Sequence, residues 1–300
     1  MKSGIINVYK EKGFTSFDVV AKLRGILRTK KIGHTGTLDP DAEGVLPVCI
    51  GRATKVCDIL TDKDKIYEAV MLLGVETDTQ DTSGEVLKEL PVNVSEKVVR
   101  EAILSFVGEY AQVPPMYSAL KINGKKLYEL AREGKTVERK ARNVQIFSIE
   151  ILEMNLPRVR MSVHCSKGTY IRTLCHDIGQ KLGSGGCMEK LLRTKVGIFE
   201  LKDTLKLSEI NELAKAGVVE EKIISVDELF EDYAKVWTKQ AFDVAVHNGN
   251  RIEKRMLEEE LPANTERLRV YDSEGTFIGI YEYSMERKDF KPMKMFYENN

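Results

Sequence analysis

Apolar residues recur along the chain at two spacings, and each spacing predicts one kind of element. Alternating or uninterrupted apolar stretches are typical of strands, whereas spacings of three and four are typical of helices. Strands are predicted at residues 4–9, 45–50, 65–74, 144–152, 159–165 and 191–199. Helices are predicted at residues 15–27, 53–60, 95–106 and 125–133, then around Arg172 up to Leu182, and last from Ser225 onward.

The first of these helices has a clear start signal. Thr15 and Asp18 have the spacing of a capping box, in which each side chain binds the backbone of the other residue. The apolar residues that follow at helical spacing are Phe17, Val20, Leu23 and Leu27. We expect them to form one buried face of the helix.

The order of the elements indicates an α+β fold. Strands and helices do not repeat as β-α units, so residues 1–232 are expected to form a mixed, mainly antiparallel sheet with flanking helices. In residues 233–300, two short strands joined at Glu274-Gly275 indicate a small all-β domain. Asn123-Gly124 is a strong hairpin signal. Together with the helix that follows this turn, it predicts that residues 121–142 form an excursion from the sheet.

Charge is balanced overall but not along the chain. Lys plus Arg and Asp plus Glu number 46 each, so the net charge is zero. Residues 121–142 carry eight basic and three acidic side chains, whereas residues 209–232 carry eight acidic side chains and two lysines. A segregated basic face can bind phosphates through its local field. Two solvated helices of opposite charge are the alternative.

Composition is that of an ordinary globular protein, with 42% hydrophobic and 31% charged residues. No apolar run approaches the length needed to cross a bilayer, and the first residues lead into a strand rather than a signal peptide, so the cytoplasm is the expected location. The five cysteines form no CxxC pair. This pattern favours reduced thiols over a disulfide framework or a zinc site.

Residues 33–44 concentrate the candidate chemistry. They hold one histidine, His34, and three carboxylates, Asp39, Asp41 and Glu43, between glycines. Glycines permit tight turns and a close approach to a ligand, and loops of this kind tend to carry function. A solvated surface connection is the alternative for such a composition.

The carboxylates of this segment resemble the first half of a calcium-binding EF-hand loop. The twelfth position of such a loop requires a glutamate, and here it is Ile50. A calcium-binding structural protein is therefore disfavoured. Residues 51–55 lack the spacing of a phosphate-binding P-loop, so nucleotide hydrolysis has no support.

Four ordered motifs resemble those of the TruB-type tRNA pseudouridine synthases. They are residues 33–44 with 51–55, Lys65-x-Tyr67, Pro115 to Lys121, and Cys165 to Arg172. The match covers nearly the whole chain, and the C-terminal domain is similar to the PUA-like RNA-binding module of this family. The resemblance implies that the chain isomerises uridine to pseudouridine in the T-loop of tRNA, at tRNA position 55.

The resemblance also implies roles for three residues at the reaction centre. Asp39 matches the essential aspartate, which acts either as a nucleophile on the sugar or as the base in an elimination at C2′. Arg172 matches the partner arginine, which opposes the tendency of a buried carboxylate to stay protonated. Tyr67 matches the tyrosine that stacks on the target base and is a candidate for removing a proton.

Other residues are expected to contact RNA. His34 matches the histidine that enters the T-loop while the target nucleotide is flipped out, Leu191 resembles an apolar wall of the pocket, and residues 121–142 resemble an insertion that grips the tRNA elbow. The expected RNA-binding residues are His34, Lys10, Lys121, Lys125, Lys126, Arg132 and Leu191. No metal and no organic cofactor is expected. The T-arm of tRNA is the only partner implied, so a monomer without a membrane or protein partner is expected.

Two positions depart from the family pattern. Glu11 stands where a proline usually follows Lys10, and Leu192 precedes Arg193 where an arginine pair is common, which would weaken one phosphate contact. Neither departure touches the three residues of the reaction centre, so an active enzyme is expected. The alternatives are a guide-RNA-directed synthase of ribosomal RNA and a non-catalytic RNA-binding or tRNA-folding protein.

Overall fold

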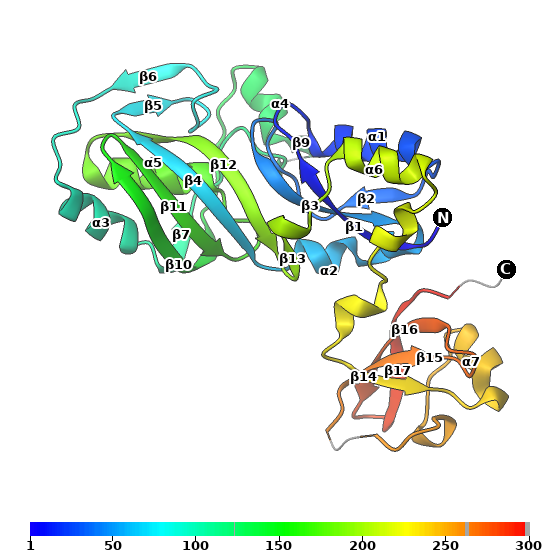
Figure 1. Cartoon of the computed structure of the whole chain (residues 1–300). Helices are drawn as coiled ribbons and strands as arrows, with labels where there is room; N and C mark the ends of the chain where they lie inside the picture. The colour runs from blue at the N-terminus through cyan, green and yellow to red at the C-terminus, as the bar shows by residue number, and fades with distance from the viewer. Residues whose placement is uncertain (123, 262–263, 298–300) are drawn as a thin grey trace.

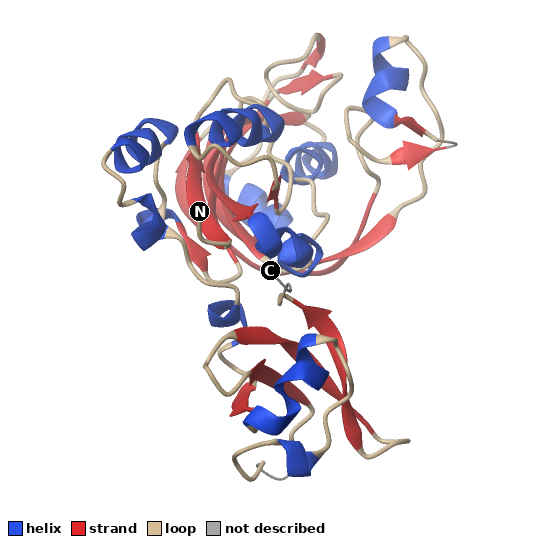
Figure 2. Cartoon of the chain, turned by 90° about the vertical axis from the view of Figure 1, so that its right-hand side faces the viewer, coloured by secondary structure: helices blue, strands red, loops and turns tan. Residues whose placement is uncertain are grey.

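A computed structural model describes residues 1–122, 124–261 and 264–297. The chain forms a large unit, built on one curved sheet, and a C-terminal unit that lies beside it (Figures 1 and 2). No helix in the described residues is long and apolar enough to span a membrane.

Helices are short and strands dominate. The α-helices are α1 (Ser16–Ile26), α2 (Cys57–Thr61), α3 (Glu96–Leu104), α4 (Leu127–Arg132), α5 (Ile171–Leu182), α6 (Leu207–Lys215) and α7 (Asp243–His247). The 3-10 helices are η1 (Gly51–Val56), η2 (Leu201–Asp203), η3 (Val219–Lys222), η4 (Asp227–Phe230), η5 (Gln240–Phe242) and η6 (Lys254–Met256). The strands of the large unit are β1 (Gly4–Lys10), β2 (Ile32–His34), β3 (Glu43–Ile50), β4 (Lys65–Leu73), β5 (Val75–Thr77), β6 (Val86–Glu89), β7 (Gly108–Gln112), β8 (Lys121–Ile122), β9 (Lys125–Lys126), β10 (Arg142–Asn155), β11 (Arg158–Cys165), β12 (Gly186–Val196) and β13 (Phe199–Glu200). Those of the C-terminal unit are β14 (Ala234–Trp237), β15 (Arg267–Tyr271), β16 (Phe277–Ser284) and β17 (Asp289–Met295).

The register of the large sheet brings three distant segments together. The strand order is β1-β3-β12-β4-β11-β10-β7, with β2 on β3 and β13 on β12. Only β3 and β12 pair in parallel along this order, and there Arg193 lies opposite Gly44. On its other edge β12 pairs with β4, where Arg193 lies opposite Tyr67. Gly44, Arg193 and Tyr67 therefore lie side by side on three neighbouring strands.

Helices cover the sheet in two groups (Figure 1). Helices α3 and α5 pack on the half that contains β4 and β11, in a core that includes Met71, Val163 and Ile178. Helices α1 and α6 contact each other and pack on β1 and β3, in a core that includes Val20 and Leu46. Each group buries one apolar face, as expected for amphipathic helices on a sheet.

The C-terminal unit has its own four-stranded sheet, in the order β14-β15-β16-β17, and the short helix α7. Its core includes Val236, Leu268 and Phe290. It also contacts the large unit: Phe296 packs in a shared cluster with residues of η1 and η4, and Lys294 Nζ lies 2.6 Å from Asp58 Oδ1. The unit is therefore docked on the large one through apolar and charged contacts.

The α+β class, the mainly antiparallel sheet and the small sheet at the C-terminus are confirmed. The capping box at Thr15 is present, with Asp18 N donating to Thr15 Oγ1 at 3.1 Å. The elements that were not predicted are mostly short: strands β2, β5, β6, β7, β13, β14 and β17 and helices α6 and α7. The predicted Asn123-Gly124 turn includes Asn123, which lies outside the described residues; β8 and β9 pair across it.

Two predictions are wrong. The helix from Ser225 is only the 3-10 turn η4, at whose start Ser225 N donates to Glu228 Oε1 at 2.9 Å. Phe17 is not buried with its helix face but is 73% exposed. The buried face of α1 is formed by Ser16, Val19, Val20 and Leu23, and Phe17 lies to one side of that face.

Substitution of Gly44 is expected to cost far more stability than substitution of another glycine with positive φ. Gly44 has φ +104°, and an added Cβ would lie 2.2 Å from Arg193 O. Gly13 has φ +86° with no atom within 4 Å of an added Cβ. Gly13→Ala adds backbone strain alone, which costs about 1–2 kcal/mol. Gly44→Ala adds strain and overpacking, which together cost about 2–5 kcal/mol. Urea unfolding of Gly44→Ala and Gly13→Ala measures the difference; equal losses would contradict the close approach of β3 and β12.

Candidate active site

Buried polar side chains hold the backbone of loop 35–42, which connects β2 and β3. Ser16 Oγ, at the start of α1, accepts a hydrogen bond from Leu38 N at 3.0 Å. Arg193 Nη2, on β12, donates to Gly36 O at 3.3 Å. The loop is thus fixed from two separate elements of the large unit, and Asp39 follows directly after one of the fixed positions.

Lys10 is a third support of this loop. It is fully buried, and its Nζ donates to the carbonyl oxygens of Ala42 at 2.6 Å and Pro40 at 3.1 Å. Burial lowers the pKa of Lys10 to about 8, although the nearby carboxylate of Asp39 opposes the shift. This position contradicts the expected contact between Lys10 and RNA, because the ammonium group has no exposed surface and is occupied by loop carbonyls.

Arg193 lies at the centre of the site and is 1% exposed. Its Nε donates to Val45 O at 2.7 Å, and its Nη2 reaches Gly36 O, so it bridges the two sides of the loop. The sequence pattern assigns this arginine no role of its own, since the expected loss of a phosphate contact concerned the Leu192 position. The structure places Arg193 inside the sheet, where its guanidinium binds backbone carbonyls.

Asp39, Arg172 and Asp81 form an ion-pair chain. Arg172 Nη2 lies 3.6 Å from Asp39 Oδ1, and Arg172 Nη1 lies 3.6 Å from Asp81 Oδ2. The arginine comes from the first turn of α5, is 6% exposed, and also donates to Tyr117 O. The expected pairing of Arg172 with Asp39 is therefore present in the geometry, and one guanidinium is shared between two carboxylates.

Burial raises the pKa of the Asp39 carboxyl above its ordinary value, and this loss of water is the largest influence on it. The charge of Arg172 acts in the opposite direction, and Asp81 adds to the increase. Arg172 thus favours the ionised form, as expected, but does not cancel the effect of burial.

Tyr67 and Leu191 line the apolar side of the site. Tyr67 is 8% exposed and packs in the same cluster as Leu38, and Leu191 packs against that cluster. Burial raises the pKa of the Tyr67 hydroxyl, while the charge of Arg193 lowers it. The tyrosine is therefore a neutral ring near neutral pH, next to a cation that favours its ionised form.

His34 lies half-buried at the end of β2. Its Nδ1 accepts a hydrogen bond from Gly36 N at 3.4 Å. Burial and the charge of Arg193 lower the pKa of His34, so the ring is mainly neutral at pH 7. It meets the ring of Phe17 edge-to-face, with centroids 5.3 Å apart at 89°.

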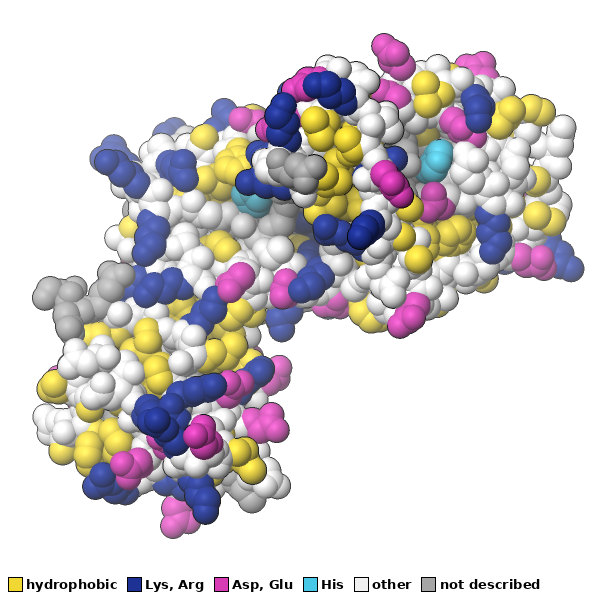
Figure 3. Space-filling view, turned by 180° about the vertical axis from the view of Figure 1, so that it is seen from behind, with side chains coloured by type: hydrophobic (Ala, Val, Ile, Leu, Met, Phe, Trp, Pro, Cys, Tyr) yellow, Lys and Arg dark blue, Asp and Glu magenta, His cyan; other side chains and the backbone are white. Residues whose placement is uncertain are grey.

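The basic excursion, residues 121–142, stands away from the rest of the large unit (Figure 2). Lys121, Lys125 and Arg132 are exposed. Lys126 Nζ and the Arg132 guanidinium lie over the ring of Tyr128, at 5.3 Å and 5.5 Å from its centroid. On the face that carries α4, Lys and Arg side chains surround a hollow in the surface (Figure 3).

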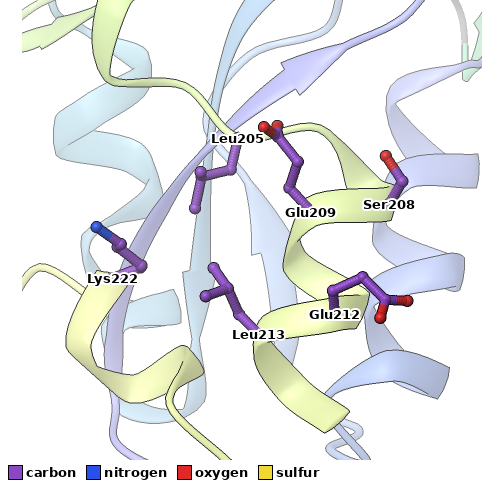
Figure 4. A pocket seen from close by; sticks show the side chains of 6 residues that line it. All are labelled: Leu205, Ser208, Glu209, Glu212, Leu213 and Lys222. Atoms are coloured by element: carbon purple, nitrogen blue, oxygen red, sulfur yellow. The ribbon is translucent and has the colours of Figure 1, made fainter. Parts of the chain in front are cut away.

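A separate hollow between α6 and η3 does not belong to this site. It is lined by Leu205, Ser208, Glu209, Glu212, Leu213 and Lys222 (Figure 4). None of the candidate residues lines it. Among the residues that the structure describes, no group of three or more His, Cys, Asp and Glu side chains is placed to hold a metal ion.

Sequence reasoning missed Asp81 and gave no role to Arg193. Asp81 lies in the connection between β5 and β6, where its carboxylate also accepts a hydrogen bond from Thr79 Oγ1 at 2.8 Å. The stretch of Asp, Thr and Ser before a glycine signals such a turn but not its distant partner Arg172. For Arg193, the available signal was a charged residue within a predicted apolar strand.

Two family models match the chain. One, described as TruB family pseudouridylate synthase (N terminal domain), matches residues 24–171. The other, described as tRNA pseudouridylate synthase B C-terminal domain, matches residues 172–231. Both the loop that contains Asp39 and the helix that contains Arg172 lie within the matched residues.

Curated relatives are similar over nearly their full length. The tRNA pseudouridine synthase B of Lachnoclostridium phytofermentans is 55% identical over 305 residues, which cover 98% of this chain and 99% of that protein. The protein of the same name from Clostridium acetobutylicum is 47% identical over 292 residues, covering 97% of this chain and 99% of that protein.

Solved structures share the fold. The chain matches a structure of a Cbf5-Nop10-Gar1 complex with a TM-score of 0.74 and 28% identity, over 98% of this chain and 84% of that one. It also matches a structure of an H/ACA RNP bound to a substrate RNA containing 2′-deoxyuridine. The TM-score is 0.72 and the identity 25%, over 98% of this chain and 85% of that one.

Replacing the neighbours of Asp39 is expected to move its pKa in opposite directions. Arg172→Met removes a positive charge and should raise it further, whereas Asp81→Asn removes a negative charge and should lower it. An NMR titration of the Asp39 side-chain carbon measures both shifts. Arg160→Met, which breaks an exposed pair with Glu68, is the control and should leave the titration unchanged. Shifts of the same sign in both variants would contradict the ion-pair chain.

Proposed function

The chain belongs to the TruB family of pseudouridine synthases, and from this we propose that it converts uridine to pseudouridine in the T-loop of tRNA, at position 55. The observation that carries the proposal is Asp39, held in a rigid loop beside Arg172. A carboxylate fixed beside a cation suits a reaction at a ribose, because it can stay ionised while water is excluded.

In the proposed reaction, the N1–C1′ bond breaks, the base rotates, and a C5–C1′ bond forms. The proton on C5 leaves and N1 gains a proton, so the reaction balances as an isomerisation. Asp39 acts on the ribose, either by bonding to C1′ or by removing the proton at C2′. Arg172 favours the ionised form of this carboxylate, and Tyr67 stacks on the base.

The target base must leave its stack to reach Asp39, which costs a few kcal/mol. Contacts elsewhere on the RNA supply this energy. We assign them to His34, which enters the T-loop, to Leu191 as a wall of the pocket, and to Lys121, Lys125, Lys126 and Arg132 of the basic excursion. Lys10 is left out of this set because it is buried.

We also propose a division of the chain. Residues 1–232 form the catalytic domain, and residues 233–300 form a PUA-like RNA-binding domain, with the sheet β14–β17 as its core. The enzyme acts as a monomer in the cytoplasm, on the T-arm of tRNA. Guide-RNA-directed modification is less well supported, since the matched H/ACA RNP and Cbf5-Nop10-Gar1 structures are 25% and 28% identical, whereas a curated relative named tRNA pseudouridine synthase B reaches 55%.

Asp39→Asn is expected to abolish pseudouridine formation on an unmodified tRNA transcript while leaving the Kd for that transcript within about twofold. The amide removes the ionisable group but keeps the shape of the side chain. The exposed neighbour Asp41, changed to Asn in the same loop, is the control and should retain activity. Turnover by Asp39→Asn, with or without a chelator, would contradict the assignment.

Reversing the charges of Lys125, Lys126 and Arg132 is expected to weaken tRNA binding and flatten its salt dependence. Each lost phosphate contact reduces the slope of log K against log salt by roughly 0.7–0.9. Filter binding between low and moderate salt measures the slope. A matched triple reversal at the exposed Lys206, Lys215 and Lys222 should leave it unchanged. An unaltered slope in the first variant would show that the basic excursion is only a solvated face.

A further inference from the structure

Phe17 is an exposed aromatic ring in a position that the fold does not require. It is 73% exposed, although the sequence pattern placed it in the apolar face of α1. Its main ring partner is His34, whose ring it meets edge-to-face at 5.3 Å. Burial of a phenylalanine in a core stabilises a fold, but this side chain contributes little core contact. We therefore looked to the surface around Phe17 for a role other than folding.

The position of Phe17 is tied to the active-site loop. The preceding residue, Ser16, is hydrogen-bonded to Leu38 N, and the next residue along that loop is Asp39. The capping box of Thr15 and Asp18 fixes the first turn of α1, so the ring is held by a rigid backbone. Helix α1 lies against β2, which carries His34 (Figure 1). Phe17 thus belongs to the rim of the site.

Exposed aromatic rings are how proteins hold unpaired bases of RNA. Sequence-tolerant stacking of a base on an aromatic side chain is general, because every base has a π-face. In an edge-to-face contact His34 can cover at most one face of the Phe17 ring, and the side chain is 73% exposed. A loop of RNA opened by His34 would present unstacked bases at this point.

We propose that Phe17 is a further RNA-binding residue, whose ring stacks on an unpaired base of the T-loop beside His34. The inference rests on the proposed function. Because the stacked base is not the reacting one, the contact is made equally in the bound state and in the transition state. It therefore strengthens binding without changing the chemical step.

The test uses the full-length protein and a T-arm stem-loop RNA. Phe17→Ala should raise the Kd and KM by about 5- to 150-fold, the range for one lost base stack, and leave kcat within about twofold. Phe17→Tyr keeps a ring and should retain binding. Phe17→Leu keeps apolar volume but no ring and should behave like the alanine variant. The melting temperature should be unchanged in all three.

A second Phe–His pair in the chain provides a matched control. Phe147, on β10, is 47% exposed, and its ring lies 4.7 Å from that of His164 on β11. His164 is opposite Ile66 in the sheet, one residue before Tyr67, so its side chain points to the face away from the site. Phe147→Ala should leave Kd and KM unchanged.

The outcomes separate the two proposals. If the wild-type protein forms pseudouridine but Phe17→Ala binds RNA normally, stacking at Phe17 is wrong and the proposed function stands. A fall in kcat without a change in KM would also overturn it. If the wild-type protein binds the stem-loop but forms no pseudouridine, the proposed function fails instead. Rescue of binding by Phe17→Tyr but not by Phe17→Leu supports stacking over simple apolar contact.

Discussion

The site depends on how one buried cation is solvated. A guanidinium taken out of water needs hydrogen-bond acceptors, or its burial costs several kcal/mol. For Arg193 the acceptors are the carbonyl oxygens of Gly36 and Val45, on either side of the loop that carries Asp39. The loop cannot move away without removing those acceptors from a buried charge. Because Arg193 needs these acceptors, it restrains the loop that carries Asp39.

Lys10 extends the same principle from the opposite strand. Its ammonium group is buried against the carbonyls of Pro40 and Ala42, so two cations hold the loop through backbone oxygens rather than carboxylates. The charge of Lys10 then acts on Asp39, whereas the charge of Arg193 acts on Tyr67 and His34. Arg172, in contrast, is divided between Asp39 and Asp81. This sharing explains why a neighbouring arginine does not offset the full effect of burial on the Asp39 carboxyl.

The sequence predicts the elements and the loop, but not what holds the loop. Periodicity and capping signals locate most helices and strands, and the glycines of residues 33–44 mark the site. The parallel pairing of Gly44 with Arg193 depends on two strands about 150 residues apart in sequence, which no local pattern contains. For the same reason, no local pattern reveals that Asp81 pairs with Arg172 or that Lys10 is buried. A lysine at the end of a strand looks the same whether it faces water or a buried carbonyl.

The separation between Asp39 and the RNA-contacting surfaces has an energetic consequence. Base flipping is unfavourable until other parts of the RNA are bound, so its cost falls on contacts that take no part in the chemistry. Charged contacts to phosphates, such as those proposed for residues 121–142, are strong but carry no information about which nucleotide is presented. Rings at the rim are better suited to that task, because stacking requires a base that has already left its helix. If residues 121–142 and Phe17 bind RNA as proposed, an enzyme with no net charge uses a local positive field for capture and an exposed ring for selection of the opened loop.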